Sequence, residues 1–268
     1  MTPTEQISVA FLAARREGRA LPDYPGEVPP TLADAYAVQA RSVSDWGEPV
    51  VGFKVGGIPE KWREQYPSPW LAGPVFESAL VHMESDGPLE VGVFEGGFAA
   101  YEPELVMRLG GLGAARPHID SLDVAKAFVR RVHIGAEIAS SPLKALNALG
   151  PGSIVSDFGN QVAVVVGSEI DRGWLDRLDE LEVATEIDGA EVGRACVKAD
   201  ENGPLGAVRF VLNHLRNSRH GPLPDDIWVS TGAITGVHES KPGTRCTMSY
   251  GGLGTVSVSM VARRGQQA

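Results

Sequence analysis

Two glutamates alternate inside an otherwise apolar run, YEPELVM at residues 101–107. If this run forms a β-strand, its two-residue period points Glu102 and Glu104 to the same face, about 7 Å apart along the backbone. A buried pair of carboxylates is costly unless a positive group lies beside it. The run therefore predicts either a bound divalent cation or a strand face on which both side chains are solvated.

A third carboxylate, Glu137, stands alone in a second apolar run at residues 134–139. Three isolated acids in apolar strands are harder to explain as solvated faces than two. Three carboxylates that leave positions free for water or substrate suit Mg²⁺ or Mn²⁺. Zinc is disfavoured because no cluster of His or Cys accompanies the acids. We therefore predict that Glu102, Glu104 and Glu137 hold a divalent cation.

The overall charge limits the partners that this chain can attract. Its 268 residues are 43% hydrophobic and 22% charged, which is ordinary for a globular protein with one large core. The formal net charge of −10 disfavours nucleic acid and anionic membranes. A small anionic substrate would need a local cation to overcome this field. We expect a small-molecule partner and neither of the two macromolecular ones.

The two cysteines, Cys196 and Cys246, lack metal-ligand spacing. Two reduced thiols are typical of a cytoplasmic protein, so we expect that location. No run reaches 18 consecutive apolar residues, so no membrane span is predicted. The apolar run at residues 7–14 follows Glu5 rather than a basic residue, which favours a helix over a signal peptide.

Helical signals dominate the first 70 residues and strand signals the remainder. Helical spacing marks residues 4–17 and 32–46, the second after Thr31 as N-cap. Residues 57–73, rich in Pro and aromatic side chains, predict a lid-like loop. Asp188-Gly189 is a strong hairpin signal. We predict a helical segment with this loop over residues 1–70 and a β-rich, metal-binding catalytic core over residues 71–268.

Strands and helices do not alternate regularly after residue 74, so a doubly wound parallel sheet is disfavoured and an α+β fold is predicted. No Gly-x-Ser-x-Gly motif is present, which argues against a serine hydrolase. The glycines near residue 252 lead into a strand with no Lys-Ser/Thr after them, so they do not form a phosphate loop.

Lys54 is the single charge in a strand-like run at residues 50–56. Such a lysine can extend its ammonium to solvent. It can instead bind a substrate carboxylate, or transfer a proton with a lowered pKa. Asp157 and Asn160 lie in a polar loop before an apolar strand, where they either form a turn or support a site.

Seven stretches in the same order together resemble the fumarylacetoacetate hydrolase superfamily, and within it the 2-keto-4-pentenoate hydratase branch. They read DAYAVQ, VGFKVG, EPEL, AEI, SDFGN, VSTG and YGGLGTV, from residue 34 to residue 256. The resemblance implies a β-rich mixed-sheet roll around a central pocket, with an N-terminal helical part packed on it. It also implies a homo-oligomer.

The resemblance implies Mg²⁺ or Mn²⁺ on Glu102, Glu104 and Glu137, chelated by the 2-oxo group and carboxylate of a 2-keto acid. It places Lys54 where the hydratase branch has a lysine beside the substrate. The expected function is a hydro-lyase that adds or removes water on a 2-keto acid such as a 2-hydroxy-2,4-dienoate, as in aromatic catabolism.

On this basis we expect Lys54 and Asp157 to act in catalysis and Asn160 and Thr231 to bind substrate. Lys54 would transfer a proton or orient the substrate carboxylate. The 157–160 loop would give polar support, and Thr231 would contact the carboxylate through its backbone or its hydroxyl.

The chain departs from the hydratase pattern at two places. Residues 140–142 read Ser-Ser-Pro where Asp and then Ser-Arg are usual, and residues 70–72 read Trp-Leu-Ala where an acid is usual. No histidine precedes His82, whereas the carbon–carbon hydrolases of the superfamily use a His–Glu pair near the N-terminal side. The alternatives are a decarboxylase or isomerase of a 2-oxo acid on the same fold, or a catalytically idle small-molecule binder.

Overall fold

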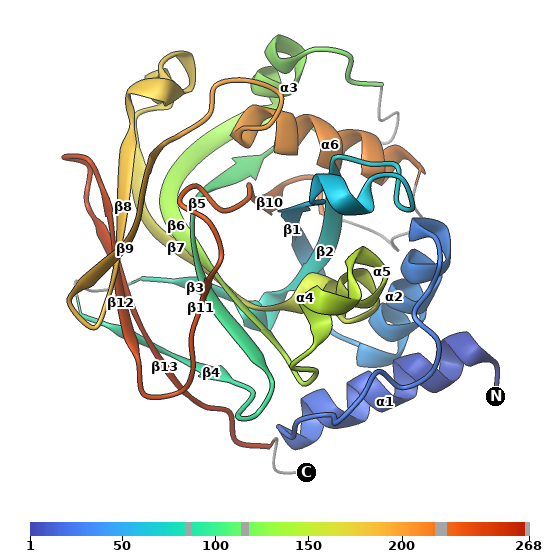
Figure 1. The fold of residues 1–268 in the computed structure, drawn as a ribbon. Coiled ribbons are helices and arrows are strands. Elements are labelled where there is room, and N and C mark those ends of the chain that lie inside the picture. The colour runs from blue at the N-terminus through green and yellow to red at the C-terminus, as the bar shows by residue number, and fades with distance from the viewer. Residues whose placement is uncertain (84–86, 114–117, 218–223, 266–268) are drawn as a thin grey trace.

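The computed structural model describes residues 1–83, 87–113, 118–217 and 224–265. Helices lie on one side of the molecule and the smaller of two curled β-sheets on the other (Figure 1). The helices are α1 (Pro3–Glu17), α2 (Leu32–Trp46), α3 (Leu122–Phe128), α4 (Leu146–Leu149), α5 (Pro151–Ser156) and α6 (Pro204–Asn217). The strands are β1 (Val50–Gly57), β2 (Trp70–Phe76), β3 (Leu80–His82), β4 (Leu89–Val93), β5 (Phe98–Leu109), β6 (Val129–Ser141), β7 (Gln161–Ile170), β8 (Glu182–Ile187), β9 (Ala190–Cys196), β10 (Ile227–Ser230), β11 (His238–Glu239), β12 (Arg245–Tyr250) and β13 (Thr255–Ala262).

Both sheets mix parallel and antiparallel pairs. The larger has the order β2-β1-β10-β5-β6-β7-β3, with β11 added against β5, and the smaller has the order β4-β13-β12-β8-β9. Strand β1 runs parallel to β10, β3 to β7, and β4 to β13, while the remaining pairs are antiparallel. The predicted α+β architecture with mixed sheets is therefore confirmed.

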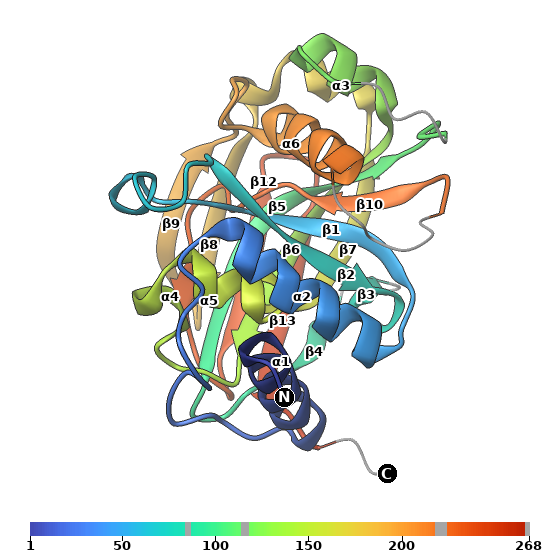
Figure 2. The same cartoon turned by 90° about the vertical axis from the view of Figure 1, so that its right-hand side faces the viewer.

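The two N-terminal helices begin where the sequence predicts. Thr2 caps α1 in a capping box with Glu5, and the Thr31 hydroxyl accepts from the Asp34 amide at 3.1 Å to cap α2. Both helices end at a glycine with left-handed backbone, Gly18 and Gly47. Their buried faces pack against each other, and α2 also packs against α5, beside the larger sheet (Figure 2).

The core lies between the two sheets and under α6. Four residues of α6, at helical spacing, are buried in this core: Val208, Val211, Leu212 and Leu215. In β5, residues 98–107 are all buried, and so are residues 132–141 of β6. Because these two stretches are buried on both faces, any charged side chain within residues 98–107 or 132–141 lies inside the protein.

The first 70 residues also contribute to the larger sheet. Strand β1 pairs with β2 and with β10, so it lies inside the sheet rather than at its edge. The division near residue 70 stays a prediction. The connection from β1 to β2 extends from the body at the left of Figure 2 and holds a short 3₁₀ helix, Glu60–Trp62. Its closing as a lid also stays a prediction.

Two further sequence expectations concern local elements. The Asp188-Gly189 turn joins antiparallel β8 and β9, with both residues at positive φ, so the predicted hairpin is confirmed. In the ranges that the structure describes, no helix is long and apolar enough to cross a membrane.

Candidate metal centre and active site

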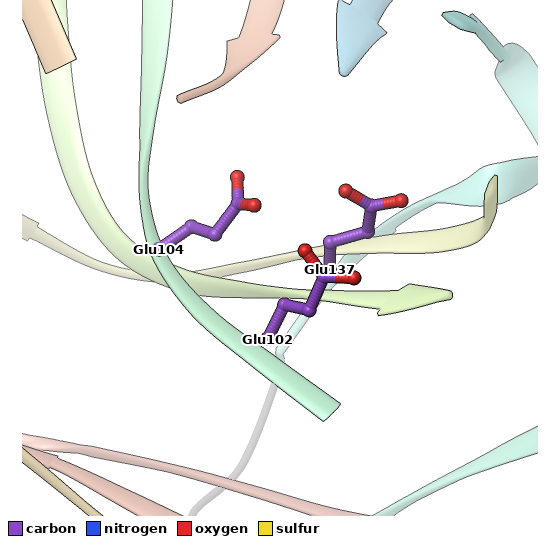
Figure 3. A group of neighbouring side chains, drawn as sticks. All are labelled: Glu102, Glu104 and Glu137. Atoms are coloured by element: carbon purple, nitrogen blue, oxygen red, sulfur yellow. The ribbon is translucent and has the colours of Figure 1, made fainter. Parts of the chain in front are cut away.

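Strands β5 and β6 bring the three predicted carboxylates together. Glu102 pairs directly opposite Glu137, and Glu104 lies two residues further along β5. One carboxylate oxygen from each of the three lies within 4.8 Å of the others. Figure 3 shows the side chains of the three glutamates gathered over the paired strands. All three are buried, with exposed fractions of 5% or less, so the solvated-face alternative is excluded.

The carboxylates are only partly satisfied by the protein around them. The Ser230 hydroxyl donates to Glu104 Oε2 at 2.5 Å. Among the described residues, Glu104 Oε1 has no hydrogen-bond partner, and the Glu137 carboxylate has only the ammonium of Lys54. Buried oxygens without donors are costly, so this cluster offers free ligand atoms to a cation.

Burial disfavours the charged forms of these acids. Burial and the neighbouring Glu102 raise the pKa of Glu104 to about 8. Burial also raises the pKa of Glu102, and it raises that of Glu137 well above its usual range against the opposing charge of Lys54. When ionised, three carboxylates face one ammonium, so two negative charges stay unbalanced. The donor set thus fits a hard divalent cation and could hold one.

Lys54, on β1, is 3% exposed and lies beside the acids. Its Nζ lies 2.9 Å from Glu137 Oε1, donates to Gly159 O at 2.9 Å and donates to Asn160 Oδ1 at 3.1 Å. Burial alone would lower its pKa, but Glu137, Glu102 and Glu104 outweigh that effect and raise the pKa. The lowered pKa considered from the sequence is therefore wrong for this arrangement, which favours the charged form of Lys54.

The same loop supplies two of the three Lys54 contacts. Phe158, Gly159 and Asn160 form a short 3₁₀ turn, and all three have positive φ, at 55°, 67° and 61°. A Cβ on Gly159 would lie 3.0 Å from Lys54 Cδ and 2.9 Å from Gly73 Cα. Only glycine fits there, because both the backbone conformation and the close approach exclude a side chain.

One cavity joins Lys54 and Glu102 to the two predicted substrate-binding residues. Its volume is about 570 Å³, and Asn160 and Thr231 both line it. The Thr231 hydroxyl donates to Leu105 O at 2.8 Å, so its proton is already used. Trp70, at one of the two departures from the hydratase pattern, also lines the cavity.

Asp157 does not line this cavity. Its Oδ1 lies 2.5 Å from Nε of Arg15, on α1, and both side chains are buried. Its predicted catalytic role stays a prediction without support from this position. Residues 140–142 are likewise absent from the lining. Ser140 donates to Phe98 O at 2.6 Å, and Pro142 O accepts from the Leu21 amide, so this departure contributes backbone contacts.

Two contacts of the site were not predicted from the sequence. Ser230, which donates to Glu104, belongs to the VSTG stretch, where nothing in the sequence singles it out. Arg15 was missed because it is charged. Ile7, Phe11 and Arg15 follow one another at intervals of four residues, so the helical period alone places Arg15 on the buried face of α1. A cation on an apolar helical stripe is the signal that predicts a buried partner.

Comparison with known proteins finds similar three-dimensional structures and no matching sequences. No protein-family model matches the sequence, and no curated protein sequence matches it. A 4-oxalocrotonate decarboxylase from Pseudomonas putida G7, complexed with magnesium and adipate, is 23% identical with a TM-score of 0.73, covering 96% of this chain and 97% of its own. A fumarylpyruvate hydrolase from Pseudomonas aeruginosa, in complex with Mn²⁺ and pyruvate, is 19% identical with a TM-score of 0.56, covering 81% of this chain and 91% of its own.

A 5-carboxymethyl-2-hydroxymuconate delta-isomerase from Mycobacterium smegmatis is 18% identical with a TM-score of 0.54, and the match covers 81% of each chain. At these sequence identities, the similarity establishes the fold alone. The resemblance drawn from the seven sequence motifs is confirmed at this level.

Proposed function

We propose that this chain, which has the fold of the fumarylacetoacetate hydrolase superfamily, is a divalent-metal-dependent enzyme that acts on a small 2-oxo acid. One observation carries the proposal. Three buried carboxylates within 4.8 Å of one another lie beside a buried ammonium, and a cavity of about 570 Å³ reaches this cluster. Strongly shifted pKa values, unpaired oxygens and a cavity together are typical of an active site.

Glu102, Glu104 and Glu137 would hold Mg²⁺ or Mn²⁺. When bound, the cation would polarise the 2-oxo group and stabilise the negative charge of an enolate. The solved neighbours with magnesium and with Mn²⁺ support this choice of cation. The excess of negative charge in the cluster supports it independently, because a hard cation removes the repulsion between the acids.

Lys54 would act as a fixed cation and proton donor. Its three contacts, to Glu137, Gly159 and Asn160, leave the ammonium little freedom to rotate. Since these contacts use all three of its protons, Lys54 would exchange one acceptor for a substrate carboxylate or deliver one of these protons to a carbon of the enolate. Asn160 would hold Lys54 in that direction, and Thr231 would offer its hydroxyl oxygen to the substrate.

The reaction we propose first is hydration. With 2-hydroxypenta-2,4-dienoate, a proton moves to the end of the conjugated chain, and water adds its hydroxyl to C4 and a proton to C3. The product is a 4-hydroxy-2-oxo acid. The ammonium of Lys54 is the group of this chain that can supply or relay such a proton.

Decarboxylation of a 2-oxo dicarboxylate is the second candidate, and a specific observation favours it. Three exposed cationic residues, Lys61, Arg63 and Lys198, line the cavity in a chain whose net charge is −10. They are suited to a second carboxylate at the far end of a substrate. The decarboxylase neighbour also covers more of this chain, at a higher TM-score, than the hydrolase and isomerase neighbours quoted above.

Incubation of the purified protein and Mg²⁺ with 2-hydroxypenta-2,4-dienoate and with an unsaturated 2-oxo dicarboxylate tests both reactions. Loss of the dienol absorbance with formation of a 4-hydroxy-2-oxo acid supports hydration. Release of CO₂ from the dicarboxylate supports decarboxylation. Metal-dependent binding of both acids without turnover would indicate a small-molecule binder, and no Mn²⁺ binding at all would refute the proposal.

The other sequence expectations stay predictions. They are a homo-oligomer, a cytoplasmic location, a place in aromatic catabolism, and no nucleic-acid or membrane partner. Light scattering of the purified protein measures the subunit number directly.

A further inference from the structure

A buried ion pair ties the first helix to the loop that holds Lys54. Arg15, on α1, and Asp157 are 142 residues apart in sequence, and their Nε and Oδ1 atoms lie 2.5 Å apart. The side chains are 5% and 0% exposed. Removing both charges from water is costly, so such a pair is weak evidence for stability and invites a search for another role.

The Arg15 guanidinium also holds the backbone on both sides of the 158–160 turn. Its two terminal nitrogens donate to Asp157 O at 3.0 Å and to Gln161 O at 3.1 Å. The guanidinium carbon lies 5.1 Å from the centre of the Phe158 ring. One planar group therefore fixes the residue before the turn, the residue after it and a side chain within it.

The backbone of the 158–160 turn, which lies between these two contacts, has a strained conformation. Three consecutive residues have positive φ, and two of them, Phe158 and Asn160, are not glycine. Such a conformation persists where the surrounding structure imposes it. Arg15 contacts both of its ends, which are also held by the bonds of the Asp157 amide to α5 and by the pairing of Gln161 with Ala139 of β6.

The same turn directs Lys54. The Gly159 carbonyl and the Asn160 side chain both accept from Lys54 Nζ. If the turn relaxed, both acceptors would move, and Lys54 would keep only its contact with Glu137. The chain of contacts runs from Arg15 and Asp157, through three left-handed residues, to the ammonium in the site.

We propose that Arg15 and Asp157 are positioning residues that hold the 158–160 turn and thereby aim Lys54 at the substrate. The proposal rests on the proposed function for its catalytic consequence, but its structural part, the placement of Lys54, stands apart from that function. It gives Asp157 an indirect role in place of the direct one expected from the sequence.

The test uses the full chain with Arg15→Gln, Arg15→Lys and the double variant Arg15→Gln/Asp157→Asn. The double variant leaves neither member of the ion pair charged without the other, so it serves if Arg15→Gln does not fold. Arg41→Gln is the control, because it removes exposed ion pairs with Asp45 on α2 and with Glu5 on α1 and touches no residue of the site. Each folded variant is crystallised, its Mn²⁺ affinity is measured by calorimetry, and its exchange of pyruvate methyl protons in D₂O with Mn²⁺ is followed by NMR.

In Arg15→Gln or the double variant, we expect Lys54 Nζ to lose its hydrogen bonds to Gly159 O and Asn160 Oδ1. The maximal exchange rate should fall at least tenfold, with Mn²⁺ affinity within threefold of wild type. Arg15→Lys should restore part of the rate, and the control should match wild type. A lower melting temperature with Lys54 unmoved and the exchange rate per folded molecule unchanged would overturn the proposal. Absence of exchange in wild type refutes the proposed function, and the position of Lys54 in the variant crystals then decides this proposal alone.

Discussion

The ammonium of Lys54 lies 2.9 Å from a carboxylate oxygen of Glu137, and both side chains are buried. Glu137 is at the same time one of the three acids whose oxygens lie within 4.8 Å of one another. The lysine and a bound cation would therefore share one carboxylate. Any change in the charge of this cluster is expected to alter both metal affinity and the direction of Lys54.

Replacing one of the clustered acids should remove most metal binding. Glu102→Gln or Glu137→Gln keeps the shape of the side chain but loses a charged oxygen, so Mn²⁺ affinity should fall at least about tenfold. Calorimetry with Mn²⁺ measures this directly. Glu169→Gln is the matched control, because Glu169 pairs with Arg131 at the surface. Unchanged affinity in both cluster variants would show that the cation, if any, binds elsewhere.

Replacing Lys54 should separate chemistry from metal binding. Lys54→Met keeps the volume of the stem and removes the proton donor, so kcat should fall by about 10²–10⁴-fold while the metal is retained. Lys126→Met is the control, since Lys126 pairs with Asp176 away from the cavity. Turnover close to wild type in Lys54→Met would reduce this residue to a structural partner of Glu137.

How far the sequence predicts this molecule depends on the range of the interaction. Period and spacing predicted the strand around Glu102, the span of α1, the N-cap of α2 and the hairpin at Asp188, because each depends on nearby residues. The placement of Glu137 opposite Glu102 depends on strand register, which the sequence does not contain locally. The isolated acids in apolar runs and the family resemblance both predicted a shared cation site, but neither gave the register that places the two residues opposite each other.

The roles of Asp157 and Lys54 show most clearly what could not be predicted from the sequence alone. Asp157 was expected in catalysis because it sits in a polar loop of the family pattern, but the structure turns it toward Arg15. Lys54 was considered as a lysine of lowered pKa, which burial alone would give. Its pKa is raised because strands far apart in sequence bring three acids beside it. Both outcomes are set by long-range partners.

The metal-free protein should lose stability as pH rises from about 5 to about 8. The folded protein binds a proton on Glu104 more tightly than an ordinary glutamate of pKa 4.5 does, with a pKa of about 8. Between these values the folded state holds more protons than the unfolded state, so each pH unit costs up to about 1.4 kcal/mol of unfolding free energy for such a group. Urea unfolding at pH 5.5 and pH 7.5 in EDTA measures the change.

Two additions make the pH test specific to the acid cluster. Saturating Mn²⁺ should restore much of the stability lost at pH 7.5, because a cation that binds only the folded form stabilises it. Glu104→Gln should flatten the pH dependence of the metal-free protein. A metal-free protein that is equally stable at both pH values would contradict the raised pKa of Glu104.

Gly159 should tolerate no side chain. Gly159→Ala adds a Cβ 2.9 Å from Gly73 Cα and 3.0 Å from Lys54 Cδ, in a residue with φ of 67°. Gly47→Ala is the matched control, because Gly47 has φ of 82° and open space around a Cβ. Strain alone should cost the control about 1–2 kcal/mol, and the contacts should cost Gly159→Ala about 1–3 kcal/mol more. If urea unfolding showed the same loss of unfolding free energy in Gly159→Ala and Gly47→Ala, the 158–160 turn would be able to move away from Gly73 of β2 at little cost.

The cationic residues of the cavity should discriminate between substrates with one and two carboxylates. Lys61 and Lys198 are exposed and line the cavity. In Lys61→Ala/Lys198→Ala, KM for a 2-oxo dicarboxylate should rise about threefold to tenfold, because two exposed attractions to the distal carboxylate are lost. KM for a monocarboxylate such as 2-hydroxypenta-2,4-dienoate should change little. The effect should shrink as salt is added, since these charges are screened. Lys126→Ala is the control for a general change in surface charge. An equal rise in KM for both kinds of acid would show that the two lysines act on the overall field of the protein, and it would remove the support that they give to a dicarboxylate substrate.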